Sequence, residues 1–123
     1  MLRYLVFLML LVVSFPAQAE NYESLDPRTG NNLLALCKEA ETQGKYLSTG
    51  LCFGYIAGVL ETAAFVEKSN NVCLLNLPQG LTFGQAARIF IKHAEEKPEI
   101  LHYRSAQIVF ASMIQAFPCK TPE

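Results

Sequence analysis

The sequence predicts an all-α fold, a small antiparallel bundle of about four helices stapled by two disulfides. Three observations support this prediction. Apolar residues recur at the 3–4 spacing of a helix in four separate segments. No segment shows the alternation that a pair of β-strands requires. Four cysteines, Cys37, Cys52, Cys73 and Cys119, lie in a short chain that begins with an export signal, which is typical of a disulfide framework.

The first 19 residues predict export. A short basic start at Arg3 precedes an apolar run from Leu5 to Val13, and "AQA" at 17–19 is a small-residue cleavage site. The run is too short for a membrane-spanning helix. Removing residues 1–19 from the 123 leaves 104, enough for a single helical domain over residues 20–123. We therefore expect a soluble periplasmic protein without a lipid anchor.

The charge balance bears on the class of partner. Once Arg3 is removed with the signal peptide, nine basic residues face eleven acidic ones, for a net charge of about −2. This excludes general nucleic-acid binding, which depends on a basic surface. Protein and small-molecule partners stay open.

The first two helices are predicted in the first half of the mature chain. After a loose polar segment, Asn31 or Asn32 can cap a helix that Gly44 terminates. A longer helix covers about 47–68, with an apolar stripe from Cys52 to Val66. The segment 69–80 is predicted as a loop whose leucines pack down onto the bundle.

The last two helices have clearer boundaries. Thr82 followed by Gln85 matches the capping box and predicts the start of the third helix. This helix closes before Pro98, because the residue that precedes a proline is pushed out of helical geometry. A fourth helix is predicted from about Ser105 to Phe117.

Antiparallel neighbours constrain the disulfides. The first turn centres near residue 44, so Cys37 lies level with Cys52. Cys52 and Cys73 sit at opposite ends of the long helix, roughly 30 Å apart, and cannot pair. The third and fourth helices return Cys119 to the end where Cys73 lies. We predict Cys37–Cys52 and Cys73–Cys119, and expect neither a metal site nor a cofactor because zinc-type spacings such as CxxC are absent.

The stretch "STGLCFGYIAGVLE" places Gly50, Gly54 and Gly58 on one face of the long helix. Each glycine costs roughly 1 kcal/mol relative to alanine in a helix, so something should approach this face closely. Two readings remain open, close packing of a neighbouring helix or a homodimer or partner face, and we favour the packing. The spacing also resembles a membrane packing motif, but Glu61 would lie in the apolar slab, so we expect no stable membrane insertion.

The segment "KHAEEKPEILHYR" is the most polar feature of the second half. It is either a solvated connection between helices or a projecting recognition loop, in which Tyr and Arg anchor a protein interface. The partner-binding candidates are Glu95, Glu96, Lys97, Pro98, Glu99, His102, Tyr103 and Arg104. His93 and His102 are expected to be exposed loop residues. No HExxH, GxSxG or phosphate-binding glycine loop is present, so we expect no enzyme.

Four stretches together resemble one family. "CFGYIAGVLE" (52–61), Cys73, "LPQGLTFGQ" (77–85) and "KPEILHYRSAQIVFASMIQAFPC" (97–119) are similar to the Tai-type (Rap/Tai) immunity proteins, periplasmic antitoxins of type VI secretion amidase effectors. The resemblance covers Gly30 to Cys119. One departure is the spacing of four residues between Cys73 and Pro78, where a shorter one is expected, so the 70–80 loop is expected to differ in shape.

The resemblance implies an all-α protein, often a homodimer, that binds a cognate peptidoglycan amidase and sterically blocks its active-site groove. The inserted element is then expected at 95–104, with the 70–80 loop as second choice. The alternative functions are a generic periplasmic binding or acid-stress chaperone module, and a cell-wall enzyme. A chaperone would bind many clients and an immunity protein one.

Overall fold

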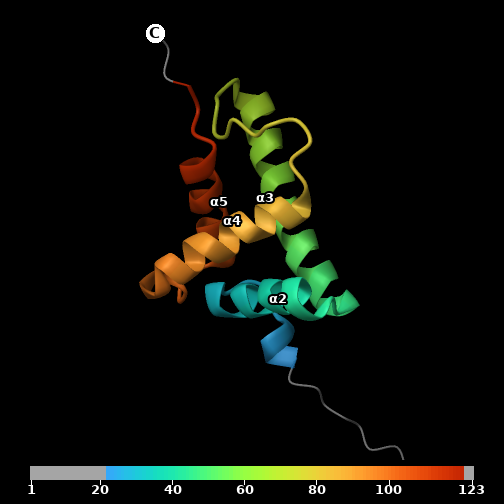
Figure 1. Ribbon diagram of the computed structural model, residues 1–123. Coiled ribbons are helices and arrows are strands. Elements are labelled where there is room, and N and C mark those ends of the chain that lie inside the picture. Colours follow the sequence, from blue (N-terminus) through green and yellow to red (C-terminus); the bar gives the residue numbers. More distant parts are fainter. Residues whose placement is uncertain (1–21, 121–123) are drawn as a thin grey trace, which may run out of the picture.

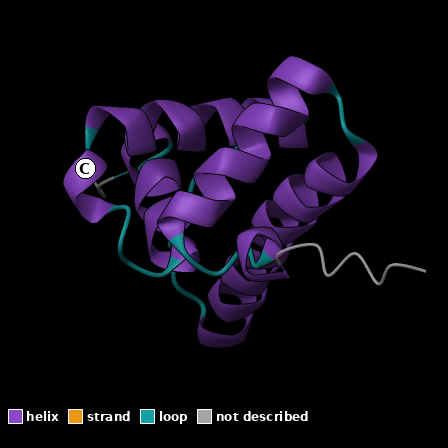
Figure 2. Cartoon of the chain, turned by 90° about the horizontal axis from the view of Figure 1, so that it is seen from below, coloured by secondary structure: helices purple, strands orange, loops and turns teal. Residues whose placement is uncertain are grey.

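The computed structural model describes residues 22–120, which form helices and no β-strand (Figure 2). The predicted signal peptide lies outside the described residues. In chain order the elements are the 3-10 helix η1 (Tyr22–Leu25), α2 (Gly30–Gln43), α3 (Tyr46–Asn70), α4 (Phe83–Glu96), the 3-10 helix η2 (Pro98–Ile100) and α5 (Ser105–Ala116). The predicted all-α class and its four helices are confirmed.

The helix ends follow from local chemistry. The Thr82 hydroxyl accepts a hydrogen bond from the backbone N–H of Gln85, whose side chain accepts from the N–H of Thr82, so the predicted capping box is present. Gly44 ends α2 in the left-handed conformation, at φ 60°. The predicted caps Asn31 and Asn32 are wrong. Thr29 caps α2 instead, because its hydroxyl accepts from the N–H of Asn32 at 3.3 Å.

The core draws on every α-helix. Leu33 of α2, Ile56 of α3, Phe90 of α4, and Val109 and Met113 of α5 have no exposed surface. Figure 1 shows α4 passing in front of α3, with α2 across the lower end of α3 and α5 beside α4. The loop at 71–82 and the segment after α5 lie together at the opposite end. Each of the four α-helices contacts the other three, and Phe90 belongs to the core that they share.

Both predicted disulfides are confirmed. Cys37–Cys52 joins α2 to α3 with a Cα–Cα distance of 5.0 Å, and Cys73–Cys119 joins the 71–82 loop to the C-terminal segment at 6.1 Å. They span 15 and 46 residues. The chain-entropy model gives roughly 3 and 4 kcal/mol of stabilisation for loops of these lengths. The bridges therefore supply a large share of the stability expected for a domain of this size.

Close packing of a neighbouring helix on the glycine face of α3 was expected and is wrong. A Cβ atom built at Gly50, Gly54 or Gly58 would have no described atom within 4 Å. All three glycines are exposed, because the residues of α3 that lie in the core, such as Cys52, Ile56 and Leu60, are on another face of the helix. Close packing on this face would also predict that Gly54→Leu destabilises the monomer through overpacking, and this prediction is wrong for the same reason.

α3 thus has an apolar face that nothing in the described chain covers. Among the described helices it alone is long and apolar enough to cross a membrane, and only 22% of its most apolar window is buried. The same helix carries the Cys37–Cys52 disulfide and five buried residues, as the central helix of a small bundle does. Length and composition alone therefore do not place α3 in a membrane.

The glycine that close packing requires is Gly30, at the start of α2. A Cβ there would lie 2.4 Å from Cδ1 of Ile108 and 2.7 Å from the carbonyl oxygen of Leu101. Both distances are far inside van der Waals contact, and the second neighbour is backbone. Any side chain at position 30 must therefore push α2 away from α5 and from the turn that contains Leu101.

We predict that Gly30→Ala lowers the free energy of unfolding by about 1–3 kcal/mol, through overpacking against Ile108 and Leu101. Gly50→Ala is the matched control. It meets open space and gains helix propensity of roughly 1 kcal/mol, so its stability should equal or exceed that of the unchanged protein. Urea unfolding with the disulfides intact measures both. Equal stability of the two variants would contradict the close approach at Gly30.

Candidate functional site

The predicted recognition turn is a compact structure between α4 and α5. Pro98 starts η2, and backbone hydrogen bonds run from Ile100 to Lys97 (3.1 Å), from Leu101 to Pro98 (3.2 Å) and from Tyr103 to Ile100 (3.0 Å). Ile100 and Leu101 are half-buried and pack against the core. The turn is therefore anchored by its apolar middle.

The N-terminus of α2 holds the turn from the other side. The N–H of Gly30 donates to the carbonyl of Tyr103 at 3.1 Å, and the N–H of Asn31 donates to the carbonyl of Leu101 at 3.0 Å. The first N–H groups of a helix have no partner within that helix and lie at the positive end of its dipole. Carbonyls of the turn satisfy them here, which fixes the turn to α2.

The segment before α2 adds a second brace. The N–H and the hydroxyl of Ser105 donate to the carbonyls of Arg28 (2.9 Å) and Pro27 (2.5 Å). Arg28 in turn forms a two-pronged ion pair with Asp26, with nitrogen–oxygen distances of 2.8 Å. The side-chain hydrogen bond from Arg28 lowers the pKa of Asp26 from its ordinary 3.8, and the backbone N–H of Arg28 adds to this effect.

Six of the eight candidate residues lie on this braced turn and are exposed: Lys97, Pro98, Glu99, His102, Tyr103 and Arg104. We call these six residues the crest. Half of the Tyr103 surface (51%) is exposed, and its ring lies 4.2 Å from that of His102, centroid to centroid, at a tilt of 44°. The crest therefore presents aromatic and charged side chains on a rigid backbone.

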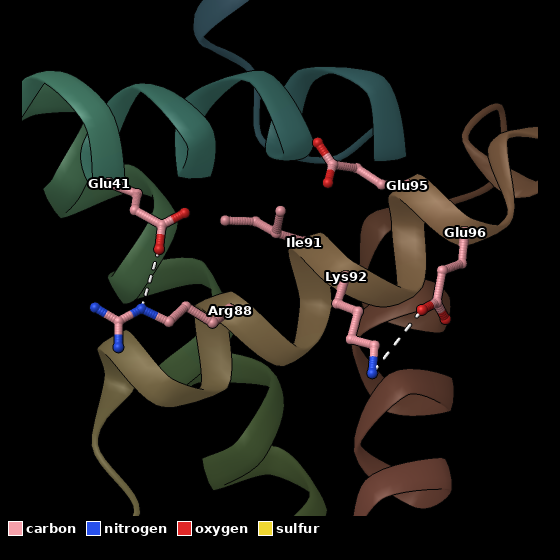
Figure 3. A pocket seen from close by; sticks show the side chains of 6 residues that line it. All are labelled: Glu41, Arg88, Ile91, Lys92, Glu95 and Glu96. Carbon is pink, nitrogen blue, oxygen red and sulfur yellow. Dashed lines mark hydrogen bonds and ion pairs between the residues drawn. The ribbon is translucent and has the colours of Figure 1, made fainter.

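The other two candidates, Glu95 and Glu96, lie on α4 and line a shallow hollow between α2 and α4. Figure 3 shows them there with Glu41, Arg88, Ile91 and Lys92. Arg88 pairs with Glu41 at 3.0 Å, Lys92 with Glu96 at 3.9 Å, and Glu95 with Lys38 at 2.5 Å. These carboxylates already have basic partners among the described residues, whereas Lys97, Glu99 and Arg104 of the crest form no ion pair there.

His93 was expected as an exposed loop residue, and this is wrong. It lies within α4, is 8% exposed, and its Nδ1 forms a 2.8 Å hydrogen bond with Oε1 of Gln115 on α5. α4 extends to Glu96, three residues past His93, so His93 lies within the helix, and its ring faces Gln115 of α5. His102 is exposed as expected.

The second candidate loop, at 70–80, is pinned at three points. Glu67 Oε1 accepts hydrogen bonds from the N–H groups of Leu74 (2.5 Å) and Leu75 (2.7 Å), and the N–H of Asn76 donates to the carbonyl of Phe117 at 3.0 Å. Glu67 also lies within 4.8 Å of the sulfurs of Cys73 and Cys119. Zinc requires thiolates, and these sulfurs form a disulfide, so the group acts as a clamp on the loop.

A broad apolar depression runs between α3 and α5. It encloses about 730 Å³ and is lined by Gly54, Tyr55, Gly58, Val59, Thr62, Ala63, Val66, Leu74, Ala106, Gln107 and Phe110. The open glycines of α3 form part of its wall. Phe65, 71% exposed, belongs to the same helix. Sequence reasoning identified these glycines but not the groove, since the groove depends on where α5 lies.

A family model of Rap1a immunity proteins matches residues 29–119, nearly all of the described chain. The chain belongs to the Rap1a immunity protein family. The matched range begins at Thr29, which caps α2, and ends at Cys119 of the second disulfide, so it contains all four α-helices. No curated protein and no solved structure matches the chain.

Membership of the Rap1a family indicates the general role of this protein. Proteins of this family are immunity proteins, so an effector partner is implied, and the family assignment indicates an inhibitor without enzymatic activity. All four cysteines of this Rap1a protein are paired, so the thiol that a cysteine nucleophile needs is not available.

The Asp26–Arg28 brace predicts a pH dependence. Because the folded-state pKa of Asp26 is lowered, its carboxylate stabilises the fold above about pH 4, and this contribution is lost as the pH falls toward the folded-state pKa. Asp26→Asn should therefore be less stable than the unchanged protein at neutral pH, and the difference should shrink as the pH falls below about 4. Urea unfolding across this range checks it, with the exposed Glu61→Gln as control. A difference that does not change with pH would contradict the prediction.

Proposed function

We propose that this protein acts in the periplasm, where it binds a cognate peptidoglycan amidase of a type VI secretion system and sterically covers its active site, so that the producing cell is protected. Three observations support the proposal. The chain belongs to the Rap1a immunity protein family. Its first 19 residues have the pattern of an export signal. Its two disulfides suit an oxidising compartment.

The braced crest is the observation that carries the proposal at the level of residues. A loop that inserts into an active-site groove must hold its shape in water, because ordering it on binding would cost affinity. Hydrogen bonds from Gly30, Asn31 and Ser105 hold this turn before any partner arrives. Tyr103 and Arg104 are the residue types that most often anchor protein interfaces. Inhibition by the crest would require no chemistry from the immunity protein.

The test uses the mature protein and the amidase encoded beside its gene. The double variant Glu99→Arg/Arg104→Glu reverses two charges of the crest and keeps the net charge, and we expect roughly 100-fold weaker binding and loss of amidase inhibition. Glu41→Arg/Arg88→Glu is the matched control. It exchanges an exposed ion pair between α2 and α4, away from the crest, and should bind as the unchanged protein does.

Two results would count against this proposal. Unchanged inhibition by the crest variant, with loss of inhibition by a Gln79→Arg variant, would move the inserted element to the 70–80 loop. Absence of binding by the unchanged protein to that amidase would refute the proposed partner and leave the family membership without it.

We further propose that the protein is a homodimer and that the open face of α3 is its interface. Gly50, Gly54 and Gly58 leave room for a second backbone, while Phe65 projects from the same helix. Twofold contacts are self-complementary, so Phe65 of each copy can lie over the glycines of the other. Burial of this face would also remove the apolar surface of α3 from water.

Gly54→Leu tests the dimer. Because nothing within the chain lies near this position, the variant should fold and keep its thermal stability as a monomer, yet lose dimerisation in sedimentation equilibrium. Ala35→Leu, an exposed substitution on α2, is the control and should dimerise normally. An unchanged protein that is monomeric at all concentrations would contradict the proposed dimer.

A further inference from the structure

A second hollow adjoins the crest, on the side of α5. It encloses about 500 Å³ and is lined by His93, Lys97, Ile100, Tyr103, Gln107, Ile108, Ala111, Ile114 and Gln115. Ile108 is buried at 2% exposure, whereas Ile114 is 39% exposed. The small side chain of Ala111 on the outer side of α5 leaves the space between these residues open. The lining is mainly aliphatic and aromatic, and Lys97 is its one permanently charged member.

The hollow and the crest share walls. Lys97 and Tyr103 are crest residues that also line the hollow, and Ile100 between them is the apolar anchor of the same turn. A protein that binds the crest therefore covers the mouth of the hollow as well. The continuity of the two surfaces favours a single occupant for both, which is the partner of the crest.

The walls of the hollow are held in place in the free protein. The 2.8 Å hydrogen bond between His93 and Gln115 ties α4 to α5 across the hollow. The N–H of Tyr103 donates to the carbonyl of Ile100 at 3.0 Å, and the carbonyl of Tyr103 accepts from Gly30 at 3.1 Å. A preformed apolar pocket binds an inserted side chain without the cost of ordering its walls.

We propose that this hollow receives a large apolar side chain of the amidase effector, carried on a segment with a neighbouring carboxylate that pairs with Lys97. The inference rests on the proposed function and adds a reciprocal contact. The crest enters the effector, and a residue of the effector enters the immunity protein beside the crest. Buried anchors of this kind, ringed by polar residues, contribute most of the binding energy of many interfaces. Here Gln107, Gln115 and Lys97 form the polar ring.

The experiment fills the hollow with a larger side chain at Ala111, one of the residues that line it. Ala111→Phe places a ring in the space without substituting any crest residue, and Ala111→Ser at the same position leaves the space open. Binding to the amidase encoded beside the gene is measured by calorimetry, with circular dichroism and thermal unfolding as checks on folding. We expect Ala111→Phe to weaken binding by about tenfold or more, while Ala111→Ser stays within about twofold of the unchanged protein.

The charge is tested separately. Lys97→Gln should weaken binding by about three- to tenfold and reduce its dependence on salt, whereas Lys97→Arg should retain most of the affinity. Because Lys97 is exposed, neither substitution should alter folding.

The outcomes separate this inference from the proposed function. If Ala111→Phe binds as tightly as the unchanged protein while Glu99→Arg/Arg104→Glu does not bind, the hollow is empty in the complex and only the inference fails. If Ala111→Phe does not fold, Ile114→Lys at the exposed rim replaces it, and unchanged binding would again overturn the inference. Failure of the unchanged protein to bind the amidase would overturn both proposals.

Discussion

The contact between the start of α2 and the turn before α5 is the constraint on which the rest of the surface depends. At Gly30 the backbone of α2 approaches Leu101 and Ile108 so closely that no side chain fits. That approach lets the first N–H groups of α2 reach the carbonyls of Leu101 and Tyr103. Helix-end hydrogen bonds that would otherwise go to water are used to shape a turn, and the crest and its adjoining hollow take their form from it.

The two disulfides cross-link different parts of the bundle. Cys37–Cys52 fixes α2 against α3, and therefore fixes the helix whose start holds the turn. Cys73–Cys119, with the Glu67 clamp and the hydrogen bond from Asn76 to Phe117, closes the far end of the bundle. The core, which includes the fully buried Leu33 and Phe90, is small because the chain is short. The disulfides compensate for the apolar area that a short chain cannot bury.

The surface divides into regions of different chemistry. The crest is polar, rigid and built on a turn, which suits a specific contact that forms and releases in water. The open face of α3 is apolar and built on a helix, which suits a permanent contact. The α2–α4 hollow carries charges that are already paired with each other, as Arg88 is with Glu41, and these pairs leave little for a partner to gain.

The sequence by itself determined the four helices, some of their caps and the cross-links. The Thr82–Gln85 capping box, the Gly44 terminator and the pairing of Cys37 with Cys52 depend on residues close in the chain or on the simple geometry of neighbouring helices. It also located the polar turn, because charge and proline content are properties of a segment. The Thr29 cap was missed because several polar residues compete at that end of α2.

Only the tertiary structure decided which glycine is in a tight contact and which face is open. The spacing of the glycines on α3 indicates that one face of the helix is flat, but whether another segment packs against that face depends on where α4 and α5 lie. Gly30 carried no periodic signal, since its neighbours, Leu101 and Ile108, are more than seventy residues away along the chain. His93 was misplaced for the same reason, because its partner Gln115 belongs to another helix. Helix caps and turns depend on residues that are close in the sequence, whereas proximity between distant segments depends on how the whole core packs.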